Sequence, residues 1–264
     1  MALATPISWA FVVSAFCLSL LVEANQTRAD TPAAESSFAA YAKQNFQTAQ
    51  AHYRKAPGEA TAAWKFARAC FDLADLATSK TERASLAEQG IAASERAIAR
   101  ESNSAPAFYY LGMNLGQLAR TRGLSALKLV KQMERAFTQS HDLDEQFDWA
   151  GPDRNLGLLY RDAPAFGSIG SRSKARDHLK RAVELAPRYP ENGLNMIETY
   201  LQWGEPNNAQ RELAALEAAW PSARTNFVGA AWAASWADWE PRRQKLKKKI
   251  EDPPKALGAP RNQS

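Results

Sequence analysis

Apolar residues recur at spacings of three and four along most of the chain, the pattern of helices with one buried face. Alternating runs of Val, Ile and Thr, which favour strands, are nearly absent. The spacing and the turn residues between segments predict about five helical hairpins. Helices are expected near 33–54, 59–77, 81–100, 105–120, 124–140, 153–162, 173–185, 191–202, 207–219 and 227–239.

A repeat is visible in this pattern. One period runs from Pro187 to Pro221, a separation of 34 residues that matches a helix pair. Earlier copies are longer, because Leu111-Gly112 recurs as Leu156-Gly157 after 45 residues. Small residues that allow close helix packing recur at Ala97, Ala136 and Ala182. The chain is therefore predicted to be all-α: a tetratricopeptide-type helical hairpin solenoid with degenerate, elongated repeats.

The last predicted helix carries a stripe of tryptophans. Trp232, Trp236 and Trp239 are spaced by four and three residues, which places them on one face, near Trp220 and Phe227 in sequence. The end of a solenoid otherwise exposes an apolar face, so this helix is predicted to be a C-terminal cap. An aromatic surface for docking a protein is the alternative.

The first segment predicts export. An apolar stretch over 7–22 is too short for a membrane span and indicates a signal peptide cut after Ala24, with Ala29 as the second choice. The absence of Lys or Arg before it leaves an uncleaved anchor as the alternative. Phe16 precedes Cys17 where a lipoprotein signal needs a small residue, so a lipid anchor is not expected. The mature protein is predicted to be periplasmic or secreted, with Cys70 as a buried thiol.

The predicted organisation has four parts. Residues 1–24 form the signal peptide, 25–58 a linker and N-terminal helix, 59–240 the helical repeat domain, and 241–264 a basic helix end with a disordered tail. The net charge is +5. Much of the excess lies in one C-terminal run, interpreted as a solvated helical face rather than a nucleic-acid site. The run comprises Arg242, Arg243, Lys245, Lys247, Lys248 and Lys249.

No pattern in the chain predicts catalysis or a cofactor. His52, His141 and His178 lie in separate segments without the spacing of metal ligands. Asp142, Asp144 and Glu145 resemble the start of a calcium loop but lack its glycine and closing Glu, and no GxSxG motif is present. The chain is predicted not to be an enzyme and to need no metal.

One segment carries the candidate binding chemistry. Gly151-Pro152-Asp153-Arg154 has the composition of a helix start. Arg154 and Arg161 are then about two turns apart on one face, which would suit a carboxylate, with an ordinary helix start as the alternative. The loop over 163–173 is longer than a repeat needs and could line a cleft or be a plain insertion. The expected ligand- or partner-binding residues are Tyr109, Tyr110, Asn114, Trp149, Asp153, Arg154, Tyr160 and Arg161.

The central block HDLDEQFDWAGPDRNLGLLYRDAPAF, with WKFARACFDLAD and AFYYLGMNLGQLA before it and RAVELAP and PEN after it, resembles the TatT-like family. These are T components of tripartite ATP-independent periplasmic transporters within the tetratricopeptide-repeat superfamily, and the resemblance covers roughly 62–216. It implies a solenoid with a pore or cleft, association with a periplasmic solute-binding protein, and uptake of organic acids. The chain departs from the family at Phe16, where the lipobox fails.

These observations predict an exported binding protein, an accessory component of a periplasmic uptake system that holds a solute-binding protein, a small apolar anionic ligand, or both. The alternative is an envelope interaction scaffold with no small-molecule ligand. Nucleic acid is not an expected partner, and a homo-oligomer is compatible with the chain.

Overall fold

The computed structural model describes residues 32–123 and 126–252, and within them every regular element is a helix. No helix among these residues is long and apolar enough to cross a membrane. The predicted signal peptide and the tail beyond 252 lie outside the described residues. The elements are α1 (Pro32–Lys55), α2 (Ala60–Leu76), α3 (Lys80–Arg100), α4 (Ala105–Ala119), α5 (Ala126–Leu143), α6 (Phe147–Asp162), α7 (Arg172–Leu185), α8 (Pro190–Gln202), α9 (Pro206–Asn226), the 3-10 turn η4 (Ala230–Trp232) and α10 (Ala233–Glu251).

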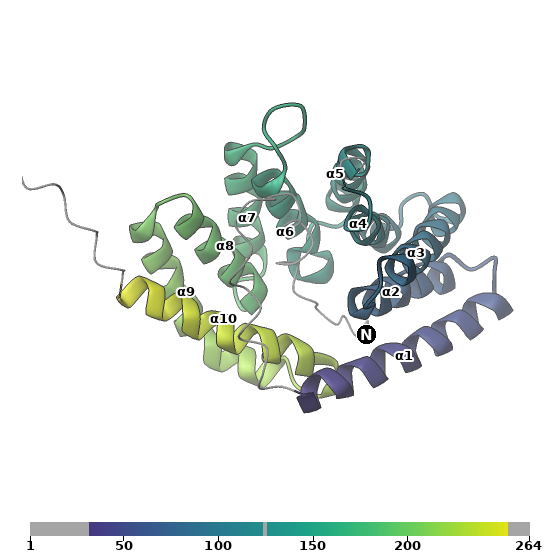
Figure 1. Ribbon diagram of the computed structural model, residues 1–264, viewed down its shortest axis with the longest axis horizontal. Coiled ribbons are helices and arrows are strands. Elements are labelled where there is room, and N and C mark those ends of the chain that lie inside the picture. The colour runs from purple at the N-terminus through teal and green to yellow at the C-terminus, as the bar shows by residue number, and fades with distance from the viewer. Residues whose placement is uncertain (1–31, 124–125, 253–264) are drawn as a thin grey trace, which may run out of the picture.

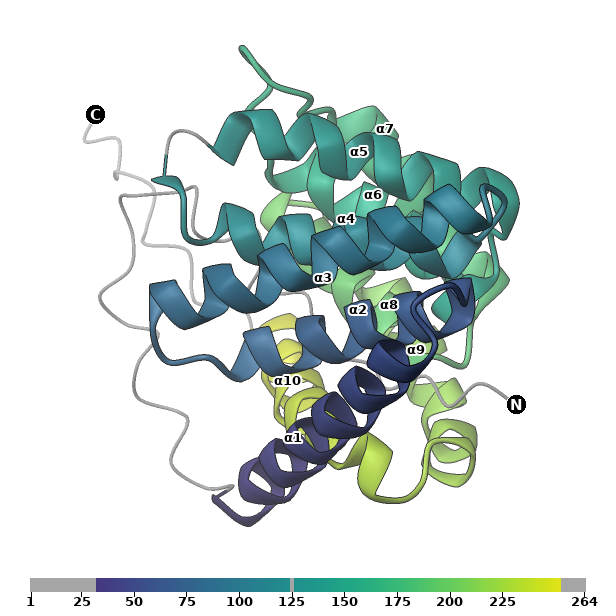
Figure 2. The same cartoon turned by 90° about the vertical axis from the view of Figure 1, so that its right-hand side faces the viewer.

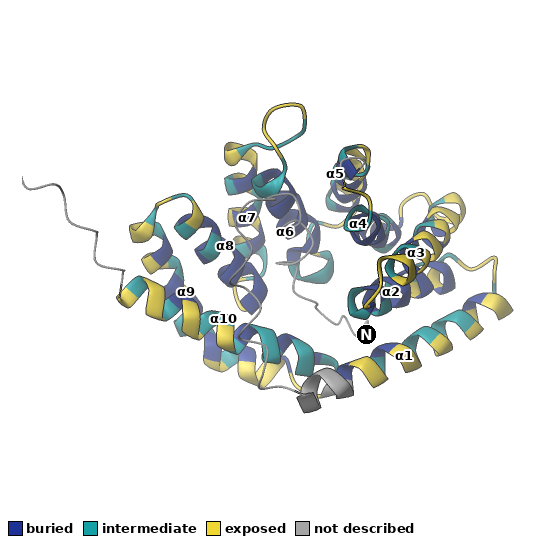
Figure 3. Ribbon diagram, viewed as in Figure 1, coloured by how far each residue is buried: buried dark blue, intermediate teal, exposed yellow. Residues whose placement is uncertain are grey.

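Four successive hairpins, α2–α3, α4–α5, α6–α7 and α8–α9, form an arch, and α1 and α10 lie beneath it (Figure 1). The first helix of each hairpin contacts the first helix of the next and is buried over most of its length. The second helix of each hairpin lies outside and is exposed along its outer face (Figure 3). The predicted helical solenoid is confirmed.

Glycines let the two helices of a hairpin approach closely. A Cβ on Gly112 would lie 2.5 Å from the Phe137 ring, and one on Gly157 would lie 2.6 Å from the Leu179 side chain. Both distances are far below ordinary contact, so no other residue fits without a shift. The recurring Leu-Gly pair of the sequence therefore marks the point where an inner helix receives a large side chain from its partner.

Helix α1 joins the two ends of the arch. It packs against α2 and also contacts η4 and α10, so the N-terminal and C-terminal parts of the described chain meet (Figure 2). The last predicted helix was placed too early, since α9 continues to Asn226 and α10 runs from Ala233 to Glu251. Pro221 does not end α9, and its side chain is exposed.

Aromatic rings hold the C-terminal helix to the arch. Trp232 and Trp239 are buried, Phe227 lies 4.6 Å from Trp232 between ring centroids, and Trp236 packs edge-on against Trp220. The tryptophan stripe thus covers the last repeat, as expected of a cap.

The basic run on α10 differs from its interpretation as a solvated face. Lys245, Lys248 and Lys249 are exposed, but Arg242 is largely buried and donates to Glu191, Glu198 and Asp238. The sequence alone could not show which of these cations is buried. The carboxylates that hold Arg242 come mainly from α8, more than forty positions away.

Candidate binding site on the inner face

An unusual turn opens α6 on the inner side of the arch. Asp148, Trp149 and Ala150 all have left-handed backbone angles, with φ of 52°, 53° and 59°. A left-handed residue other than glycine costs about 1–2 kcal/mol. Three in a row persist only where surrounding contacts hold them, and such strain concentrates at functional sites. The right-handed helix begins after this turn, so Pro152 stands in its first turn, as the sequence predicts.

Asp148 is held by two partners from different segments. Its Oδ2 accepts a hydrogen bond from the Tyr109 hydroxyl at 2.6 Å and from Nη2 of Arg154 at 2.9 Å. Burial raises the pKa of the Asp148 carboxyl, while Arg154 and Tyr109 oppose that rise. Gly151 makes this contact possible, because a Cβ there would lie 2.7 Å from the Tyr109 ring.

Arg154 fastens the strained turn to the next repeat. Only 3% of it is exposed, and Nη1 donates to the carbonyl of Trp149 at 3.2 Å and to Oδ1 of Asn192 on α8 at 3.1 Å. Its guanidinium also lies 5.1 Å from the centre of the Tyr189 ring. Asn192 in turn donates to the Trp149 carbonyl. Arg154 therefore satisfies internal groups and fixes the turn against α8.

A second buried carboxylate lies on α2. Asp72 is paired with Arg68 at 3.8 Å, and burial raises the pKa of Asp72 to about 7, with Arg68 opposing the rise. Asp148 and Tyr110 contribute to the field at Arg68. The ion pairs Arg68–Asp72 on α2 and Arg154–Asp148 on α6 thus lie near enough for their charges to interact, and the Tyr109 hydroxyl of α4 donates to Asp148.

Half-buried aromatic rings border this network. Trp64 stacks on Tyr110 with centroids 6.1 Å apart, and Trp149 stacks on Tyr189 at 5.2 Å. Phe147 packs edge-on against Tyr109 and is itself half-buried. The inner face therefore offers partly exposed rings, Trp64, Phe147 and Trp149, above a fixed polar base. We call these three residues the aromatic rim.

The eight residues predicted to bind point in three directions. Tyr109, Tyr110, Trp149 and Arg154 meet at the inner face around the strained turn. Asn114 lies between α2 and α3, where it donates to the Ala67 carbonyl and fills the space above Gly90. The remaining three residues, Asp153, Tyr160 and Arg161, lie along the rest of α6.

Arg161 shares the α8-facing side of α6 with Arg154, as the sequence predicts, and donates to Thr199 on α8. It is also paired with Asp162 at 2.6 Å. Both guanidinium groups of the expected carboxylate fork thus already have an internal carboxylate partner. Whether any of the eight residues contacts a ligand stays a prediction.

Asp153 and Tyr160 lie on the opposite, outer side of α6. The buried Asp153 carboxylate joins two histidines: Oδ2 lies 2.9 Å from Nδ1 of His141, and Oδ1 lies 2.7 Å from Nδ1 of His178. Tyr160 stacks on His178 and donates to Glu134 on α5. These contacts join α5, α6 and α7. No group of three or more potential metal ligands is found in the described part of the chain.

Sequence reasoning missed Asp148 and Asn192 at the inner face and the shared carboxylate of the two histidines. A signal existed for Asp148, which adjoins the predicted Trp149. No local signal existed for Asn192 or for the histidines, because their partners are distant in sequence.

Comparison with known proteins gives two findings. A family model described as regulator of microtubule dynamics protein 1-3 matches residues 28–145, somewhat less than half of the chain. A thermophilic TPR protein of Thermus thermophilus has a similar structure, with a TM-score of 0.54 and 18% identity, over 75% of this chain and 95% of that chain. No curated protein matches the chain significantly.

The helical arch and the structural match define a fold class: the chain has a TPR-like helical-repeat architecture. At 18% identity the structural likeness establishes the fold alone. Neither comparison points to the T-component family, so membership of that family stays a prediction.

Proposed function

We propose that this chain is an exported, non-catalytic binding protein that holds a segment of a protein partner at its inner face. The observation that carries the proposal is the strained turn at 148–150, which holds Trp149 and the adjacent Phe147 of the aromatic rim beside a fixed network. Large rings with restricted motion are common anchors of protein interfaces. The buried network supplies rigidity, because its charges are already paired.

The apolar stretch over 7–22 supports export, and the resemblance of 62–216 to T components supports a solute-binding protein as the partner. A small organic acid is the second candidate. The cations of the inner face are poorly placed to bind its carboxylate, because Arg154 and Arg161 are already paired with Asp148 and Asp162.

Co-purification from an envelope extract tests the proposal. The protein is compared with a variant carrying Trp64→Ala and Phe147→Ala, while Trp203→Ala, a substitution of a partly exposed tryptophan at the α8–α9 turn, serves as the control. A partner retained by the unchanged protein and by the control, and lost from the rim variant, is the expected result. Equal recovery with all three proteins contradicts an inner-face site.

Two further measurements test the finer parts. Native mass spectrometry of the purified protein detects an organic acid if one is held. Fusion of residues 1–30 to a reporter that is active only after export tests localisation, and a fusion that stays inactive contradicts the export proposal.

A further inference from the structure

The loop between α6 and α7 projects from the arch (Figure 1), and its sequence is apolar at the tip. Phe166 at this tip is 99% exposed, far more than the other large apolar residues exposed in the described chain, Leu143 at 40% and Val228 at 63%. Its neighbours Pro164, Ala165 and Gly167 are also exposed and carry no charge. A fully exposed phenylalanine within an uncharged segment is typical of a group that another surface buries.

The base of the loop is closed by the backbone. Gly170 N–H donates to the Pro164 carbonyl at 3.1 Å, and Ser171 N–H donates to the Tyr160 carbonyl at 2.9 Å. A Cβ on Gly170 would lie 2.0 Å from the carbonyl oxygen of Ala163, so the close approach of the two loop ends requires glycine. The hydrogen-bonded base therefore presents Phe166 outward as a defined knob.

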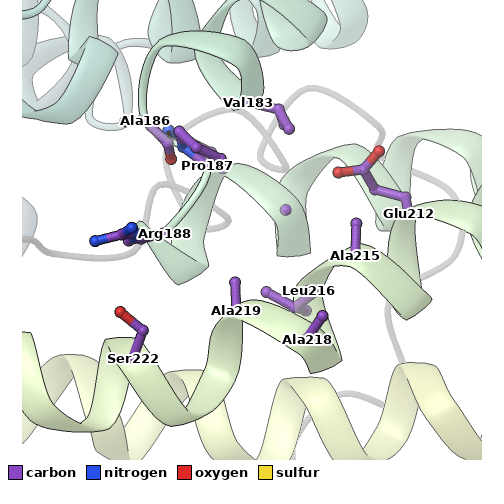
Figure 4. Close-up of a pocket in the computed structure, with 12 residues that line it drawn as sticks. Val183, Ala186, Pro187, Arg188, Glu212, Ala215, Leu216, Ala218, Ala219 and Ser222 are labelled. Carbon is purple, nitrogen blue, oxygen red and sulfur yellow. Dashed lines mark hydrogen bonds between the residues drawn. The ribbon is translucent and has the colours of Figure 1, made fainter.

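The same chain carries an apolar groove on its outer face, between α7 and α9 (Figure 4). It has a volume of about 610 Å³ and is lined largely by small or aliphatic side chains, among them Val183, Leu216, Ala215 and Ala218. The groove lies toward the C-terminal end of α7, whereas the loop precedes its N-terminal end. The part of α7 from Arg172 to Ala182, about 17 Å of helix, separates the two features.

The groove is lined by one carboxylate, Glu212, and one guanidinium, Arg188, and the loop is followed by the cation Lys174. Glu212 points into the groove, and burial raises its pKa with no opposing contribution from a cation (Figure 4). Within the described chain it forms no ion pair. Lys174, just beyond the loop, lies 4.9 Å over the Tyr160 ring and is exposed, and no described carboxylate pairs with it. A knob that enters the groove would bring a lysine toward an unpaired carboxylate.

We infer that the Phe166 knob of one copy docks in the α7–α9 groove of a second copy, so that the protein associates head to tail. Knob and groove are different patches, which makes the contact heterologous and open-ended rather than a two-fold dimer. One loop on one groove buries less than a standard interface, so association is weak and appears only at high concentration.

Sedimentation velocity over a range of about 0.01 to 1 mM, where weak self-association is measurable, tests the inference. The unchanged protein is expected to gain average mass with concentration, and Phe166→Ser to remain a monomer. Ala218→Arg fills the groove and is also expected to remain a monomer. Ala214→Arg is the matched control, because Ala214 is exposed on the same helix but does not line the groove.

Mixing the two defective variants gives the decisive result. Phe166→Ser keeps the groove and Ala218→Arg keeps the knob, so an equimolar mixture is expected to form a one-to-one dimer and nothing larger. Lys174→Glu or Glu212→Lys alone should weaken association, and both together in one chain should restore it. A monomeric unchanged protein, an equal effect of Ala214→Arg and Ala218→Arg, or a mixture that stays monomeric overturns the inference.

Discussion

Asp72 shows how a single buried residue couples stability to pH. Its pKa is raised from the ordinary 3.8 to about 7, mainly by burial. The folded state therefore holds the proton more tightly than the unfolded state. The stability that this preference contributes is fully present below about pH 4 and is lost as the pH rises through 7.

We therefore expect Asp72→Asn, which keeps the shape of the neutral carboxyl, to unfold at a higher urea concentration than the unchanged protein at pH 8. At pH 4 the two proteins should be nearly equal. Urea titrations at both pH values measure this, with the exposed Asp177→Asn as the control. If Asp72→Asn instead lowers stability at pH 8, the ion pair with Arg68 stabilises the Asp72 carboxylate by more than burial destabilises it.

Helix pairing depends on a few positions without a side chain. Gly157 in α6 and Gly112 in α4 occupy corresponding places and receive Leu179 and Phe137 from the outer helices. The sequence revealed both glycines through the Leu-Gly repeat. It did not reveal that the strained turn precedes Gly157 in the same helix, because the forces on that turn come from Tyr109 and Asn192 in other hairpins.

Gly157→Ala is expected to lower the free energy of unfolding by about 1–3 kcal/mol, since the new methyl group would press into Leu179. The matched control is Gly58→Ala, where an added Cβ meets nothing within 4 Å and the change should be near neutral. Chemical denaturation measures both variants. Equal free energies of unfolding for the two variants would show that α7 shifts away from α6 at little cost.

Closure of the whole arch depends on α10. Arg242 is held by carboxylates from α8 and from its own helix, and Trp239 donates to the buried Glu191. Burial alone would raise the pKa of Glu191, but the positive charges around it keep the pKa below its ordinary value. Helix α1 then rests on α10 and η4, so the two ends of the described chain share one support.

Arg242→Met is expected to destabilise the protein by roughly 3–5 kcal/mol, because it leaves Glu191 buried without its cation. Lys248→Met on the exposed side of α10 should change little. Hydrogen exchange localises the effect: faster exchange in α10 and α1 is expected, with α4 and α5 less affected. Equally faster hydrogen exchange in all helices would contradict the expectation that Arg242 stabilises mainly the packing of α10 and α1.

The sequence by itself determined the helical class and most helix boundaries, because apolar spacing, turn residues and small packing positions are local features of the chain. It also placed a helix start at Gly151-Pro152-Asp153-Arg154, where the right-handed part of α6 begins. Tertiary structure alone decided that Asp148, Trp149 and Ala150 adopt left-handed angles, that Asp153 joins two histidines, and that Arg242 is largely buried and held by carboxylates. Each depends on partners in other helices, and the energy of a buried charge or a strained turn is set by those neighbours rather than by the adjacent residues.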